Sequence, residues 1–267
     1  MRTSLRRMTL ILLTALQAAV VLAQGQALRY DGVADFAAVA DAPDLDPPGD
    51  FTVMVWVKPD LLPTTYYNFI LAKNMNYTGW ALSTATYSHL PAFATFNDDQ
   101  DVAQVATSVW PIEPGRWVHL AGRLSGGLVT VWMNGVMTGS NLAQLPTTPS
   151  STELFVGSSL FGGATYWKGS IDQIRIYDRA LSAVEIRAAM WDAGTPIDSR
   201  IAEWWLDEGS GTTSTDNSGN SHTLFLGTAS GYGGVTSPDW VASDRPFYND
   251  GGEWGDLSGW TAVWPVL

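Results

Sequence analysis

Apolar and polar residues alternate in short runs between residues 27 and 177, and this period of two is typical of β-strands. In FTVMVWVKP, residues 51–59, the phenylalanine and the three valines share one face, whereas Trp56 lies on the other. The predicted strands are residues 27–31, 36–40, 51–59, 68–73, 79–84, 91–97, 102–108, 116–124, 127–135, 153–159 and 170–177. Many short strands at this spacing predict an all-β protein, folded as an antiparallel two-sheet sandwich.

Local signals add a turn and a helix to this pattern. Asn134 and Gly135 form a dipeptide that favours a tight reversal between strands. After the last predicted strand, apolar residues recur every three or four positions, and Ser182 and Glu185 have the spacing of a capping box. We therefore expect one short helix that closes the sandwich and ends near Gly194.

The first 23 residues have the features of a secretory signal peptide. Arg2, Arg6 and Arg7 precede an apolar stretch, which ends in small residues suited to cleavage after Ala23. No later stretch approaches the ~18 consecutive apolar residues of a membrane-spanning helix. The prediction is a secreted or cell-surface protein, of bacterial origin, with no membrane span once the signal is removed.

Composition narrows the possible partners and sites. The chain carries 14 basic and 26 acidic residues, a formal net charge of −12, which argues against binding to nucleic acid or to anionic membranes. The absence of cysteine excludes disulfides and thiolate metal sites. Tryptophan is abundant, with 13 residues, and such a number is more than a core alone ordinarily holds.

Residues 195–267 differ from the rest of the chain. They contain two possible strands, residues 201–206 and 223–226, around a polar loop, and they have few aliphatic residues. A segment of this kind makes a poor independent core. We expect it to be a loop-rich tail that packs on the sandwich or on a partner.

Four motifs, in order, make the chain similar to a known family. They are ALRYDGVADFAAV (27–39), FTVMVWVKP (51–59), GRWVHLAGRLSGGLVTVWMNGV (115–136) and GSIDQIRIYDRALSAVEI (169–186). Together they resemble the laminin-G-like jellyroll of the concanavalin A-like lectin and glucanase superfamily. The resemblance implies a jellyroll domain over residues 24–194, but this fold serves enzymes, lectins and adhesion modules alike.

The segment AEWWLDEGSGTTSTDNSGN, residues 202–220, resembles the opening strand and loop that usually precede such a jellyroll. Here it follows one. Either it begins an incomplete second copy, which we favour, or it returns to the first jellyroll as an added edge.

Asp172 is the main candidate for a metal ligand. Strict alternation places it on the face of Ile174 and Ile176, where a carboxylate needs a cation, several hydrogen-bond donors or a raised pKa. The resemblance implies a structural Ca²⁺ site at this position, to which Asp31 and the carbonyl of Gly32 would contribute. The alternative is that Asp172 accepts hydrogen bonds from backbone N–H groups.

Aromatic residues provide the candidate ligand-binding surface. Trp56, Trp80 and Trp132 could stack against sugar rings, with Asp98 and Asp99 beside them to bind hydroxyls. The alternatives are packing within the core for each tryptophan and a solvated turn for the aspartates.

We predict no catalytic residues, because the chain lacks the alternating Glu and Asp triplet of the glucanases, and its histidines have no metal-ligand spacing. Two functional hypotheses follow. The first is a secreted, non-catalytic carbohydrate-binding or adhesion module stabilised by calcium. The second is a structural or protein-interaction component of a surface assembly, and a glycan-active enzyme ranks third.

Overall fold

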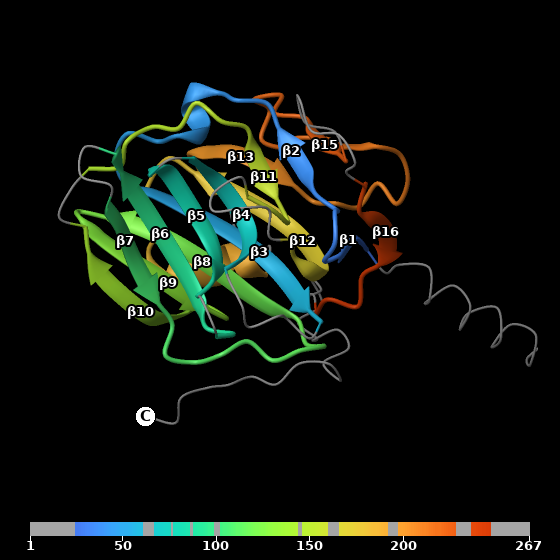
Figure 1. Ribbon diagram of the computed structural model, residues 1–267, viewed down its shortest axis with the longest axis horizontal. Helices are drawn as coiled ribbons and strands as arrows, with labels where there is room; N and C mark the ends of the chain where they lie inside the picture. Colours follow the sequence, from blue (N-terminus) through green and yellow to red (C-terminus); the bar gives the residue numbers. More distant parts are fainter. Residues whose placement is uncertain are drawn as a thin grey trace, which may run out of the picture.

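The computed structural model describes residues 25–60, 67–75, 77–85, 88–98, 102–143, 146–159, 166–191, 197–227 and 236–246. The predicted signal peptide, residues 1–23, lies outside this range. Two β-sheets pack against each other as layers, with β5 to β7 lying across β8 to β10 (Figure 1). Every pairing between the named strands is antiparallel, so the predicted all-β sandwich is confirmed.

The first sheet has the strand order β10-β9-β8-β3-β12-β1-β16, and β13 also pairs with β12. Its strands are β1 (Gln26–Asp31), β3 (Phe51–Pro59), β8 (Val118–Ser125), β9 (Leu128–Met133), β10 (Val136–Leu142), β12 (Lys168–Tyr177), β13 (Arg200–Trp204) and β16 (Asp239–Ala242).

The second sheet has the order β14-β15-β2-β11-β4-β5-β6-β7. Its strands are β2 (Ala37–Val39), β4 (Asn68–Met75), β5 (Thr78–Thr84), β6 (Pro91–Asn97), β7 (Val102–Thr107), β11 (Leu154–Val156), β14 (Thr213–Ser214) and β15 (Leu224–Leu226). Two helices are described beside the sheets, the 3₁₀ helix η2 (Pro43–Leu45) and α2 (Ala183–Met190).

The main core lies between the sheets and is built from alternate residues of each strand. In β3 the residues Phe51, Val53, Val55 and Val57 all join this core, as predicted, whereas Trp56 packs on the opposite face. Asn134 and Gly135 both have positive φ, 50° and 75°, which is the conformation of a tight turn between β9 and β10.

The helix begins as predicted and ends earlier than expected. Ser182 accepts a hydrogen bond from the backbone N–H of Glu185, and the Glu185 side chain accepts one from the N–H of Ser182, which completes the capping box. The helix stops at Met190, and the expected end near Gly194 lies outside the described residues. In the described part of the chain, no helix has the length and hydrophobicity needed to cross a lipid bilayer.

The described part of the tail supplies strands to both sheets. In the first sheet β13 pairs with β12 and β16 pairs with β1, and in the second sheet β15 pairs with β2. Trp204, Leu206, Leu224 and Leu226 are buried in the main core. The described residues between 200 and 242 thus pair into the same two sheets as the jellyroll, which is the arrangement of the added-edge alternative.

Candidate functional site

Asp172 does not share a face with the isoleucines. In the pairing of β12 with β3, Ile171 lies opposite Val57 and Asp172 opposite Trp56, and the register then shifts between Asp172 and Arg175. Gln173 has a positive φ of 43°, as an inserted residue of a β-bulge often does. The bulge keeps the isoleucines in the core and turns Asp172 to the outer face, which corrects the alternation inferred from the sequence.

On the outer face, residues after β16 bind Asp172. Its Oδ2 accepts hydrogen bonds from Ser243 Oγ at 2.8 Å and from Arg245 Nε at 3.0 Å. The Arg245 guanidinium also lies over the ring of Trp56, 5.7 Å from its centroid. Asp172 is 1% exposed, and among the described residues its Oδ1 has no hydrogen-bond partner. The charge of this carboxylate is therefore balanced by an arginine of the same chain.

The predicted calcium ligands are not brought together. Asp31 pairs with Lys168 in the ladder of β1 and β12, four residues along the strand from Asp172. Its Oδ1 accepts hydrogen bonds from the N–H groups of Val33 and Ala34, which lie in the turn that contains Gly32. Among the residues described, no three His, Cys, Asp or Glu side chains form a group that could hold a metal ion. The strand register separates Asp172 from Asp31 and Gly32, so these three residues do not form one site, and calcium binding by the protein stays a prediction.

Burial makes Asp172 sensitive to pH. Burial raises the pKa of Asp172 to about 6, against the lowering effects of the Arg245 charge and of the hydrogen bonds from Ser243 and Arg245. Since an unfolded chain has an Asp pKa of about 3.9, the stabilising contribution of the protonated form is present below pH ~4 and is lost as the pH rises through ~6.

Asp172→Asn removes this titration and nearly keeps the shape. The free energy of unfolding of the wild type, relative to that of Asp172→Asn, should fall by about 2 to 3 kcal/mol between pH 4 and pH 8. Urea denaturation of both proteins at the two pH values measures this difference. An equal difference at both pH values would contradict the expected titration.

The three predicted tryptophan platforms are buried. Trp80 lies in the main core and donates its Nε1–H to the carbonyl of Leu45. Trp56 and Trp132 lie on the outer face of the first sheet, where Trp56 donates to the carbonyl of Met190 and Trp132 lies under the guanidinium of Arg123. No ring of the three offers a free face to a sugar, so this assignment is corrected in favour of the packing alternative.

A candidate binding surface exists instead on the outer face of the second sheet. One register row crosses four neighbouring strands of that sheet and consists of Ala72, Ala81, Ala94 and Val105. Ala81, Ala94 and Val105 lie on three adjacent strands and form a shallow floor, about 10 Å wide from the first strand to the last, whereas Ala72 is fully buried beside them. In most sheets this width would be covered by larger residues.

Aromatic residues border this floor and form a groove with it. The bordering rings belong to Tyr67, Phe69, Tyr77 and Phe96, and those of Tyr67 and Phe69 lie 5.8 Å apart. The groove encloses a cavity of about 140 Å³, which Ser83 and Ala103 also line. We refer to this surface as the alanine groove.

One of the two predicted acidic residues lies near the alanine groove. Asp98 follows the end of β6, two residues after Phe96 along the chain, and accepts a hydrogen bond from Thr148 Oγ1 at 2.8 Å. Its side chain is exposed. Asp99 lies outside the described residues.

A second cavity, of about 210 Å³, lies between the segment before β8 and the turn after β9. Trp110, Trp117 and Met133 line it, and the ion pair of Glu113 with Arg116, at 3.2 Å, lies beside them. The Nε1–H of Trp117 is already donated to Asp244. Trp117 is 4% exposed, whereas Tyr67 in the alanine groove is 38% exposed, so the alanine groove is the better candidate for binding.

Comparison with known proteins identifies the fold. None of the curated proteins matches the chain. A proposed carbohydrate-binding protein from Bacteroides ovatus has a similar structure, with a TM-score of 0.63 at 15% identity. The similarity covers 84% of this chain and 61% of that one, so this chain spans less than two thirds of that protein's length.

Weaker similarities are to domain 4 of AbnA, a GH43 extracellular arabinanase from Geobacillus stearothermophilus in complex with arabinotriose, and to a heptameric SAP-like pentraxin from Limulus polyphemus. The arabinanase domain has a TM-score of 0.43 at 25% identity, and the similarity covers 53% of this chain and 66% of that one. The pentraxin has a TM-score of 0.48 at 16% identity, and the similarity covers 83% of this chain and 93% of that one. A family model described as the concanavalin A-like lectin/glucanases superfamily, Laminin_G_3, matches residues 31–187, which is more than half of the chain. The protein therefore belongs to the concanavalin A-like lectin/glucanase superfamily.

Proposed function

We propose that the protein binds a glycan, without cleaving it, in the alanine groove. The observation that carries this proposal is the groove on the outer face of the second sheet, where Ala81, Ala94 and Val105 lie between the rings of Tyr67, Phe69, Tyr77 and Phe96. A sugar ring presents C–H groups on its faces and hydroxyls around its edge. An aromatic ring can stack on such a face, and a flat floor lets the sugar approach closely.

Family and neighbours support a binding role. The superfamily includes lectins by its description, and the Bacteroides ovatus protein with a similar fold is described as carbohydrate-binding. At 15% identity this neighbour supports the fold, and the ligand is inferred from the groove itself.

The lining favours binding over hydrolysis. Glycosidases ordinarily place two carboxyl groups on either side of the scissile bond. None of the described residues that line the alanine groove is Asp or Glu, and Asp98 follows the end of β6, two residues after Phe96 along the chain.

The sequence also led us to consider a surface assembly in which the tail adds a strand to a neighbour. The described strands of the tail, β13 to β16, already pair within their own sandwich, which leaves less support for that hypothesis. We propose that the protein acts outside the cell, on the basis of the signal-like sequence of residues 1–23.

Tyr67 offers a direct test, because its side chain is 38% exposed and contributes little to the core. Tyr67→Ala should weaken glycan binding by about 1 to 2 kcal/mol, or roughly 5- to 30-fold, through the loss of a stacking face. Ala94→Leu should weaken binding as well, because it raises the floor. Affinity electrophoresis through gels that contain polysaccharides, followed by calorimetry with the best oligosaccharide, measures both effects.

Trp205→Ala is the matched control, since Trp205 is an exposed aromatic residue, 48% accessible, outside the groove. It should bind as the wild type does. Binding that is lost in Trp110→Ala, at the second cavity, and kept in Tyr67→Ala would move the site away from the alanine groove.

A further inference from the structure

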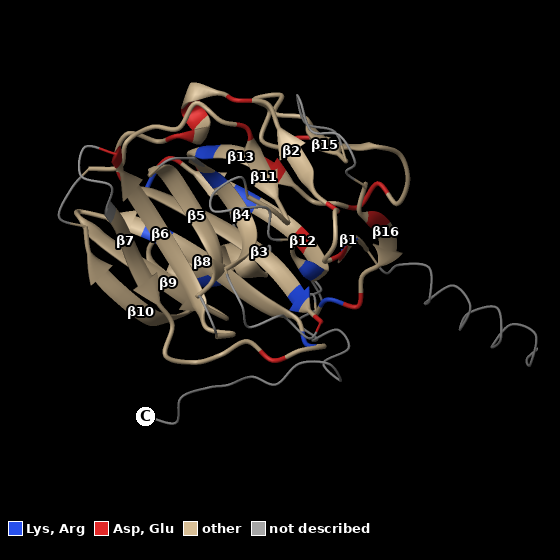
Figure 2. Ribbon diagram, viewed as in Figure 1, with Lys and Arg blue, Asp and Glu red and all other residues tan. Residues whose placement is uncertain are grey.

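The alanine groove lies on a sheet that is almost free of charge. Across the eight strands of the second sheet, Lys73 is the single residue among Lys, Arg, His, Asp and Glu. Lys73 is fully buried and points away from the groove, toward Asp41 and Asp46. Figure 2 shows β5, β6 and β7 without blue or red segments. None of the described residues that line the groove is charged.

The positive charges of the described chain lie outside the groove, and most of them are engaged in ion pairs or hydrogen bonds. Lys168 is exposed at the start of β12, in the first sheet. Ion pairs hold Arg29, Lys58, Lys73, Arg116, Arg175, Arg179, Arg200 and Arg245. Arg123 and Arg187 donate to the carbonyls of Leu181 and Gly135. A sugar carboxylate or sulfate bound in the groove would therefore find no cation beside it. Proteins that bind such groups ordinarily use Arg or Lys, because a desolvated anion without a partner is costly.

Negative charge near the groove acts in the same direction. Asp98 follows the end of β6, two residues after Phe96, and its side chain is exposed. The whole chain has a formal net charge of −12, which repels polyanions at long range.

We propose that the alanine groove selects uncharged glycans, which it binds through the apolar faces of their rings, and that it rejects glycans with carboxylate or sulfate groups. This inference rests on the proposed function. It adds the class of ligand to that proposal. Stacking on Tyr67, Tyr77 and Phe96 requires no charge on the sugar, whereas the carboxylate or sulfate of an acidic sugar would meet no positively charged donor in the groove.

The experiment compares matched polysaccharides in affinity gels with the full chain. Neutral xyloglucan, galactomannan, mixed-linkage glucan and arabinan form one set, and alginate, polygalacturonate and chondroitin sulfate form the other. The most retarding neutral polymer is then tested beside its own C6-carboxylated derivative. We expect retardation by at least one neutral polymer, and at least about 10-fold weaker binding of the carboxylated form. Because no ion pair contributes, affinity for the neutral polymer should change less than about two-fold between about 0.05 and about 0.5 M sodium chloride.

The outcomes separate the two proposals. Equal or tighter binding of the acidic polymers that is lost in Tyr67→Ala would overturn the selectivity and leave the glycan-binding groove in place. Retardation by none of the polymers, in either set, would overturn both. Ala103→Lys, which adds an ammonium group at the exposed rim of the groove, should narrow the gap between the neutral polymer and its carboxylated form; an unchanged gap would count against selection by charge in the groove.

Discussion

Replacing Lys73 by methionine should lower the free energy of unfolding by about 3 to 5 kcal/mol, because it leaves buried oxygen atoms without their cation. Lys73 Nζ is surrounded by Asp41 Oδ1 at 2.6 Å, Asp46 Oδ2 at 2.8 Å, and the carbonyls of Ser150 at 3.0 Å and Thr152 at 2.7 Å. The lysine side chain is 0% exposed and that of Asp46 is 5% exposed. The ammonium group therefore joins β4 to two separate loops.

The pH dependence of Lys73→Met distinguishes a lost ion pair from lost packing. Burial already raises the pKa of Asp46, in spite of Lys73 beside it. Without Lys73 this pKa should rise further above its unfolded value, so the variant loses stability as the pH rises through the new pKa. The difference in free energy of unfolding between the wild type and Lys73→Met, measured by urea denaturation, should be larger at pH 8 than at pH 5.

Lys58→Met is the control, because the pair of Lys58 with Asp244, at 2.6 Å, is much more exposed. It should cost less than about 1 kcal/mol. A loss for Lys73→Met that is equally small would mean that the buried lysine contributes little to folding.

Local sequence signals predicted the strands well. Residues 51–59 and 91–97 form strands with the predicted bounds, and Ser182 with Glu185 caps the helix as expected. These features depend on neighbouring residues alone, which is why the sequence was sufficient. The strand β10, Val136–Leu142, was missed because most of its side chains are polar or exposed, so it has no apolar face to detect.

Features that depend on distant contacts were not predicted. A period-two pattern does not reveal the bulge at Gln173, and a single inserted residue moves Asp172 to the other face of the sheet. Nor could the pattern show that Arg245, 73 residues later in the chain, would balance that carboxylate.

The sequence carries a signal for the alanine groove. Ala72, Ala81 and Ala94 occupy outward positions of three successive predicted strands, where larger residues are more usual. The abundance of tryptophan favoured tryptophan side chains as stacking platforms, although the aromatic border of the groove consists of Tyr and Phe. That the alanines fall in one register row becomes visible only when the strands are paired.

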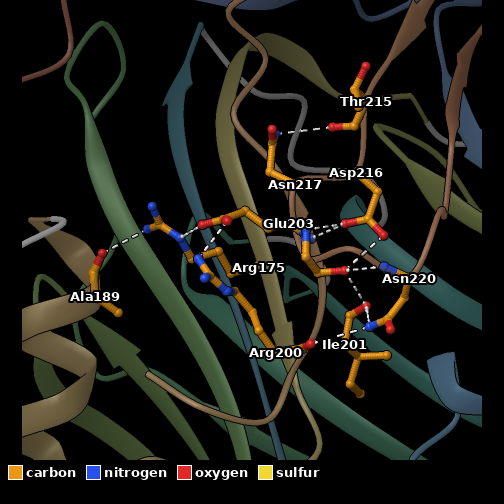
Figure 3. A network of polar contacts seen from close by, with 10 residues as sticks. Arg175, Ala189, Arg200, Ile201, Glu203, Thr215, Asp216, Asn217 and Asn220 are labelled. Atoms are coloured by element: carbon orange, nitrogen blue, oxygen red, sulfur yellow. Dashed lines mark hydrogen bonds and ion pairs between the residues drawn. The ribbon is translucent and has the colours of Figure 1, made fainter. Parts of the chain in front are cut away.

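The tail is attached to the sandwich through a buried charge network, which Figure 3 shows with Arg175 and Arg200 converging on Glu203. Glu203 accepts from Arg175 Nε at 2.7 Å and from Arg200 at 2.5 Å, and Arg175 also donates to the carbonyl of Ala189 in α2 at 2.7 Å. The backbone N–H of Glu203 donates a hydrogen bond of 3.0 Å to Asp216 Oδ1, in the loop that follows β13. One carboxylate thus connects β12, β13 and, through Arg175, the helix.

Glu203→Gln should therefore lower the free energy of unfolding by about 3 to 5 kcal/mol, because it removes the carboxylate that pairs with the Arg175 guanidinium, which is 3% exposed. Burial alone would raise the pKa of Glu203, but the hydrogen bond and charge of Arg175 outweigh it, so the pKa is lowered. The stabilising contribution of the ionised form is then present above the unfolded pKa and is lost as the pH falls through the folded one. The difference in free energy of unfolding between the wild type and Glu203→Gln should consequently be smaller at about pH 3 than at pH 7. Urea denaturation at both pH values measures it.

Glu185→Gln is the matched control for this network. It removes the partly exposed ion pair of Glu185 with Arg179 but keeps a residue that can complete the capping box, so its cost should stay below about 1 kcal/mol. Limited proteolysis adds a local readout: in Glu203→Gln the loop at residues 207–222 should be cleaved faster than in Glu185→Gln, because β13 loses its charged attachment to β12. Equal cleavage of that loop in both variants would mean that the hydrogen bonds between β13 and β12, together with the burial of Trp204, hold the tail in place without the carboxylate.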